Sequence, residues 1–159
     1  LVGQHGVAVE GDLVLALLIA VLLALALFLE THNRLGEMML AAFTEPGKIE
    51  DKVRRAVTAY CAFADEDWLS FSYHLVSLSR YLPHDTKRDD DPVSVVETLI
   101  QHLMDTGDIP KGDPAILAAM SLGVVMQSGL NKIYSRLPGP FSQHVDTFTR
   151  AIMAILLQK

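Results

Sequence analysis

The chain has 159 residues, of which 50% are hydrophobic and 20% charged, and this composition predicts a folded domain rather than a disordered chain. Thirteen Lys and Arg against nineteen Asp and Glu give a formal net charge of -6, which argues against a wholly basic nucleic-acid-binding protein. The single cysteine, Cys61, excludes an internal disulfide framework and a zinc site built from several cysteines.

The first element is an apolar run over residues 13–29, which is 17 residues long and contains no polar side chain. This length is near the lower limit for a transmembrane helix, and the flanking Glu10, Asp12 and Glu30 provide no basic anchor. One alternative is a helix that is buried on all sides within a protein. Another is that residues 7–35 depart from the natural protein, through a change of reading frame or through residues assigned without good support.

Amphipathic helices follow this run. Residues 34–43 predict a short helix, which ends at a turn over residues 44–47. Apolar residues at helical spacing predict helices over residues 48–66 and 68–82, and the acidic residues 65–67 separate the two. The predicted apolar stripes are Ile49, Val53, Val57, Tyr60 and Ala64 in the first helix, and Trp68, Phe71, Leu75, Leu78 and Leu82 in the second.

The second half begins with a predicted polar loop over residues 83–91. Asp91-Pro92 and Asp113-Pro114 each place an N-cap residue before a proline, and they predict helices over residues 92–107 and 114–137. A last helix is predicted over residues 141–158. Because no alternating strand pattern occurs, we expect an all-α fold of packed helices.

The sequence contains no recognisable catalytic or metal-binding motif. None of the six histidines pairs with another at a spacing of three or four residues, and nucleophile-elbow, phosphate-loop and dinucleotide motifs are not found. The apolar surroundings of Cys61 favour a small buried residue over a nucleophile. We therefore expect no enzymatic activity, no cofactor and no metal site.

Two helix faces suggest a binding pocket for a small molecule. Apolar side chains and amides share one face of the helix over residues 114–137, and His74 borders an aromatic stripe in the helix over residues 68–82. The alternative for both faces is ordinary core packing. The predicted pocket residues are Tyr60, Trp68, Phe71, His74, Met120, Val124, Gln127 and Asn131.

The last two predicted helices contain more apolar surface than one small bundle can cover. Because large apolar patches usually mark an interface, and twofold dimers are the commonest closed assemblies, we expect a homodimer formed by these helices. The predicted interface residues are Leu122, Met126, Phe141, Val145, Phe148, Ile152 and Ile155.

Three segments give a family resemblance. They are TLIQHLMDTGDI (residues 98–109), DPAILAAMSLGVVMQ (113–127) and IYSRLPGPFSQHVDTFTRAIMAIL (133–156). Their order resembles the C-terminal regulatory domain of the TetR family of bacterial transcription repressors. In that family a Gly-x-Ile turn leads to an Asp-Pro helix start, and a Tyr-x-Arg-Leu-x-Gly-Pro segment precedes the last helix.

The resemblance implies a TetR-like helical bundle that dimerises through its last two long helices. It also implies a cavity for a small, often apolar effector, and N-terminal helix-turn-helix domains that bind operator DNA. Binding of the effector would change the spacing of the two DNA-binding domains, so that the dimer no longer fits its operator.

The N-terminal segment departs from the family pattern. Residues 1–45 stand where the helix-turn-helix is expected, but they contain one basic residue, Arg34, against five acidic ones. Phosphate contacts supply much of the affinity for DNA, so no DNA-binding residue is assigned. We expect residues 1–45 to form this N-terminal segment and residues 46–159 to form the regulatory and dimerisation domain.

The leading interpretation is a cytoplasmic, ligand-responsive transcription repressor that binds operator DNA as a homodimer. The competing interpretation is a membrane-anchored all-helical interaction protein that uses residues 13–29 as its anchor. A ligand-binding dimer without a DNA function is the third alternative.

Overall fold

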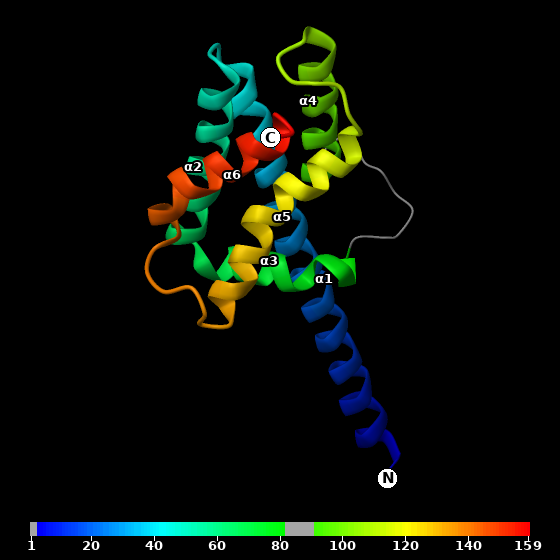
Figure 1. Cartoon of the computed structure of the whole chain (residues 1–159). Helices are drawn as coiled ribbons and strands as arrows, with labels where there is room; N and C mark the ends of the chain where they lie inside the picture. The colour runs from blue at the N-terminus through cyan, green and yellow to red at the C-terminus, as the bar shows by residue number, and fades with distance from the viewer. Residues whose placement is uncertain (1–2, 82–90) are drawn as a thin grey trace.

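The computed structural model describes residues 3–81 and 91–159, and these residues form helices and turns without any β-strand (Figure 1). The helices are α1 (Gly3–Thr44), α2 (Ile49–Glu66), α3 (Trp68–Tyr81), α4 (Pro92–Thr106), α5 (Pro114–Ile133), the short 3-10 helix η1 (Phe141–His144) and α6 (Val145–Leu156). The predicted all-α class is confirmed. Leu82 of the predicted apolar stripe and residues 83–90 of the predicted loop lie outside the described residues.

Helix α1 has two halves with different surroundings. In the first half, Leu13, Leu17 and Leu23 are 66–71% exposed, and Figure 1 shows this half projecting away from the other helices. From Phe28 onward the helix is packed, and Phe28 and Leu35 are buried. The second half therefore belongs to the bundle, whereas the first half has no protein surface against it among the described residues.

The continuity of α1 differs from the prediction of a separate helix that begins at residue 34. No proline interrupts residues 30–36, and burial of His32 and Leu35 holds this stretch in the helix. The structure therefore has one helix over Gly3–Thr44 where the resemblance implies a helix-turn-helix. Because α1 packs against α2, α3 and α4, the expected boundary at residue 45 lies within one packed bundle.

Helices α2 and α3 follow the predicted pattern closely. The apolar face of α2 includes the buried residues Val53, Val57, Tyr60 and Ala64. The predicted break occurs at Asp67, whose carboxylate accepts a hydrogen bond of 3.1 Å from the backbone N–H of Ser70. This bond satisfies one of the free N–H groups in the first turn of α3.

Both predicted Asp-Pro helix starts are confirmed. The carboxylate of Asp91 accepts hydrogen bonds from the backbone N–H groups of Val93 (2.8 Å) and Ser94 (3.1 Å). Asp113 caps α5 in the same way. Helix α4 ends at Thr106, and the next residue, Gly107, has a φ of 80° in the left-handed region that favours glycine.

The C-terminal helix is divided into η1 and α6, and its start is fixed from a distant part of the chain. Asp65, near the end of α2, accepts hydrogen bonds from the backbone N–H groups of Phe141 (2.6 Å) and Ser142 (2.9 Å). This contact holds the beginning of the C-terminal segment against α2. Phe141 is fully buried there, beside Phe71 and Phe148.

The packed helices form one apolar core. α5 packs against α3, α4 and α6, while α2 packs against α1, α3 and α6. Among the described residues, two helices are long and apolar enough to cross a membrane by length and composition: α1 from Glu10 and α5. Part of α5 is buried in the bundle, whereas the apolar part of α1 is almost entirely exposed.

Candidate functional site: an apolar cavity

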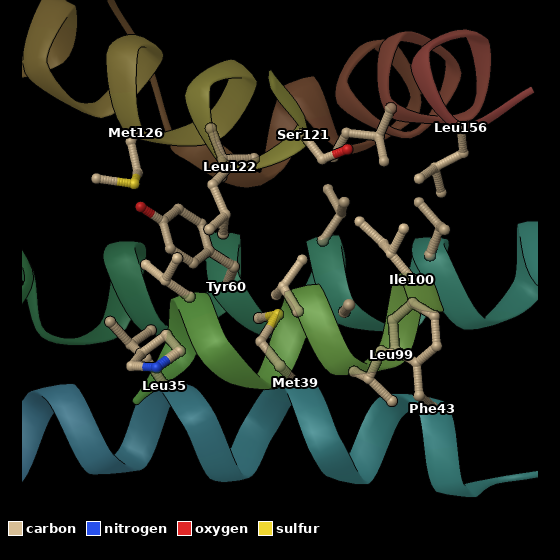
Figure 2. Close-up of a pocket in the computed structure, with 18 of the residues that line it drawn as sticks. Leu35, Met39, Phe43, Tyr60, Leu99, Ile100, Ser121, Leu122, Met126 and Leu156 are labelled. Atoms are coloured by element: carbon tan, nitrogen blue, oxygen red, sulfur yellow. The ribbon is translucent and has the colours of Figure 1, made fainter. Parts of the chain in front are cut away.

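An apolar cavity of about 100 Å³ lies in the middle of the bundle. All six α-helices contribute to its wall. Figure 2 shows Leu35 and Met39 of α1 on one side of the space, and Leu122 and Met126 of α5 on the opposite side. The cavity therefore brings together side chains from helices that are far apart in the sequence.

Among the described residues, the wall of the cavity is almost entirely hydrocarbon and contains no Asp, Glu, Lys or Arg side chain. The polar side chains in the wall are His32, Tyr60, His74 and Ser121. A charged ligand would lose its hydration without gaining an opposite charge, and such a transfer is very unfavourable. The composition of the wall therefore selects an uncharged, apolar molecule.

Two of the polar residues form a buried pair between α1 and α3. His32 Nδ1 and His74 Nε2 are 3.0 Å apart and share a hydrogen bond. The ring of Phe28 stacks on both imidazoles, with centroid distances of 5.4 Å to His32 and 5.0 Å to His74. Burial and the neighbouring His32 lower the pKa of His74 to about 4, so His74 is neutral at pH 7.

Tyr60 and Ser121 each contribute a hydroxyl group to the described wall of the cavity. Burial raises the pKa of the Tyr60 phenol far above its usual value, so this residue stays uncharged and offers only a neutral hydroxyl. The Oγ of Ser121 is buried and has no hydrogen-bond partner among the described residues. Figure 2 places the Ser121 side chain on α5, on the same side of the cavity as Leu156 of α6.

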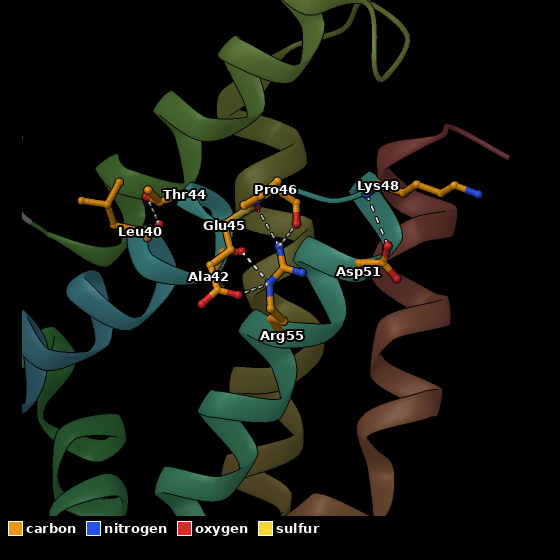
Figure 3. Close-up of polar contacts among 8 residues, drawn as sticks. All are labelled: Leu40, Ala42, Thr44, Glu45, Pro46, Lys48, Asp51 and Arg55. Atoms are coloured by element: carbon orange, nitrogen blue, oxygen red, sulfur yellow. Dashed lines mark hydrogen bonds and ion pairs between the residues drawn. The ribbon is translucent and has the colours of Figure 1, made fainter.

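Arg55 of α2 forms hydrogen bonds to the backbone at the C-terminal end of α1, beside the cavity (Figure 3). Its Nε donates to the carbonyl of Ala42 at 3.1 Å, and its Nη2 donates to the carbonyl of Glu45 at 2.9 Å. These bonds satisfy backbone groups at the C-terminal end of α1, where carbonyls lack helical partners. Phe43, which lines the cavity, is thereby held next to α2.

The predicted pocket residues are distributed over several environments. Tyr60 and His74 line the cavity. Phe71 is fully buried in the aromatic core, and Trp68 is half-buried below the ammonium group of Lys132. The predicted face of α5 points outward instead: Met120 and Gln127 are exposed, and Val124 and Asn131 are half-buried.

Most of the predicted interface residues are buried or half-buried within their own chain and do not form an exposed surface. Leu122 and Met126 line the cavity. Phe141, Phe148 and Ile152 are buried in the core of their own chain, because η1 and α6 lie against α2 and α5. Val145 and Ile155 are half-buried. The apolar surface that α5 leaves open is centred on Ile116 and Met120, which are 56% and 51% exposed.

Sequence reasoning missed most of the cavity. His32 was not singled out, since its partner is 42 residues away in the chain and no short motif joins the two histidines. The wall residues of α4 belong to an apolar stripe that looks like ordinary core. For Ser121, a small polar residue within an apolar helical stretch was the available signal.

A scan against protein-family models, a search of curated proteins and a search of solved structures find no match to this chain.

Proposed function

We propose that this protein is a ligand-binding regulator whose central cavity takes up a small, uncharged, apolar molecule. The observation that supports it most directly is the cavity itself, whose wall is formed by all six α-helices and has no charged side chain within the part of the chain that the structure describes. A ligand at this position contacts every helix of the bundle, so its binding energy can favour one arrangement of the helices over another.

The TetR resemblance extends the proposal to a homodimeric transcription repressor. Its support is the order of motifs in residues 98–156, together with the open apolar face of α5. The DNA-contacting residues stay unassigned, because Gly3–Thr44 forms one continuous helix. A gel-shift assay of the natural full-length protein with its own upstream DNA tests this extension: retardation at low salt is expected, and its absence contradicts a repressor.

Ligand binding can be tested by calorimetric titration with toluene, an uncharged single-ring hydrocarbon. We expect the wild-type chain to bind toluene. The substitution Ala56→Leu places additional carbon atoms in the cavity, because Ala56 is buried and lines it. We expect this variant to remain folded and to bind toluene at least tenfold more weakly.

The matched control is Thr58→Leu, which adds bulk to an exposed position of the same helix. This variant should bind toluene like the wild type. Equal binding by Ala56→Leu and the wild type would show that toluene binds elsewhere, and the proposal would then be wrong.

A membrane anchor is the second candidate function, and the exposed half of α1 favours it. Residues 13–29 measure about 26 Å along a helix axis, close to the roughly 30 Å hydrocarbon thickness of a bilayer. In water, the exposed leucines of this half would have no apolar surroundings. Under this alternative the bundle with its cavity would lie at a membrane surface.

A further inference from the structure

The hydroxyl of Ser121 is a buried polar group that has no partner among the described residues. The residue is only 6% exposed and lines the cavity. Serines within helices often donate to the carbonyl four residues earlier, as Ser128 does to Val124 at 2.7 Å, but Ser121 makes no such bond. A buried hydroxyl without a partner is unfavourable, so a partner within the cavity would stabilise the protein.

The Nδ1 atom of His74 is also buried without a partner among the described residues, but the His74 ring has a hydrogen bond through Nε2, whereas the Ser121 hydroxyl has none. His74 already shares a hydrogen bond with His32 and is stacked on Phe28. A bound water needs two to four polar partners, and the other described wall residues of α5 and α6 are the apolar Leu122, Val125, Met126, Ile152 and Leu156. A molecule with one hydroxyl and an apolar body matches this wall better than water does.

Building on the proposed function, we infer that the ligand is an uncharged single-ring molecule with one hydroxyl group, which hydrogen-bonds to Ser121. A hydroxyl both donates and accepts, so it can pair with Ser121 in either direction. A cavity of about 150 Å³ in another protein holds benzene, so the smaller volume of about 100 Å³ here limits the ligand to at most one ring. Ser121 is then a specificity-determining residue, since it favours hydroxylated rings over hydrocarbons of the same shape.

Phenol and toluene form a matched pair of probes, because they differ by a hydroxyl in place of a methyl group. Calorimetric titration of the full chain with each probe gives the ratio of the two dissociation constants. In Ser121→Ala, we expect phenol binding to weaken about tenfold relative to toluene binding, which is the effect of losing one hydrogen bond. The melting temperature of the unliganded variant should stay equal or rise, since no hydrogen bond within the chain is lost.

Thr149→Val is the matched control variant. Thr149 Oγ1 is also buried without a partner among the described residues, but Thr149 does not line the cavity. This variant should leave the ratio of phenol to toluene binding unchanged.

Three results would overturn the inference while leaving the proposed function in place. The first is a ratio of phenol to toluene dissociation constants that is the same in Ser121→Ala as in the wild type. The second is an equal change of this ratio in Ser121→Ala and Thr149→Val. The third is a clear loss of thermal stability in unliganded Ser121→Ala. If neither probe binds the wild-type chain, the proposed function itself fails, and the inference fails with it.

Discussion

The stacked rings of Phe28, His32 and His74 join α1 to α3 at the edge of the cavity. The two histidines can share one hydrogen bond only while at least one of the bonded nitrogens lacks a proton. Protonation of both rings would place two positive charges against each other in an apolar site. The pair is therefore a stable contact at neutral pH and an unfavourable one in acid.

Stability should consequently fall as the pH is lowered from 6.5 to about 4. His74 has a pKa of about 4 in the folded chain and about 6.5 when exposed, so the unfolded chain binds more protons within this range. The free energy of unfolding should decrease by about 3 kcal/mol from this residue alone.

Urea denaturation at a series of pH values measures this effect. The variant His74→Gln, which stays neutral, should lose much less stability over the same range. Carboxylates also titrate below pH 5, so the informative quantity is the difference between the variant and the wild type. Identical slopes for the two proteins would show that His74 does not titrate as described.

At the scale of elements, α5 presents one face to the cavity and another to the outside. Ser121, Val125 and Met126 face inward, while Ile116 and Met120 remain exposed. Ala115, Ala119 and Gly123 are exposed beside them, so this face is apolar and includes several small residues. Small residues allow close approach of a second helix, which suits a dimer contact between two copies of α5.

The dimer prediction can be tested at Met120. We expect the wild-type chain to be a dimer, and Met120→Glu to shift it toward monomer, because two carboxylates would meet across the twofold axis. Size-exclusion chromatography with light scattering gives the mass directly.

The control for this test is Leu69→Glu. Leu69 is 77% exposed on α3 and is not part of the exposed α5 face, and its substitution should leave the dimer intact. A monomeric wild type, or a dimer that is unaffected by Met120→Glu, would argue against the α5 interface.

Local signals in the sequence were sufficient for most helix boundaries, although α5 ends at Ile133 and not at the predicted residue 137. The Asp-Pro starts of α4 and α5 and the break at Asp67 depend on residues within one helical turn, and each is found where it was predicted. The sequence did not predict that α1 continues through residue 34, because this continuity depends on the burial of Leu35 by other helices. The sequence did not show which face of α5 points into the cavity and which points outward, since both faces are apolar.

At the scale of the whole molecule, the cavity exists because six helices meet without filling the space between them. No motif encodes such a space, and the residues that enclose it are far apart in the sequence. Tyr60 and His74 were predicted as pocket residues from their helix faces, but the other walls depend on packing between helices. The site is therefore a product of the tertiary structure.

The exposed half of α1 makes a separate prediction about location. A cytoplasmic regulator should remain in the soluble fraction of broken cells after ultracentrifugation, whereas a protein anchored by residues 13–29 should require detergent for extraction. In the anchored case, Leu17→Lys together with Leu22→Lys should release the protein, because charges in the apolar core of a bilayer are unfavourable. Release of the wild type by high salt alone would contradict insertion into the bilayer.

The most direct test of a ligand-binding cavity is a crystal structure of the chain soaked with bromobenzene, whose bromine is located by anomalous scattering. An anomalous peak enclosed by Tyr60, Ile100 and Leu122 is the predicted result. A fully occupied peak elsewhere, or a closed core without added density at saturating bromobenzene, would contradict a cavity that binds small apolar molecules.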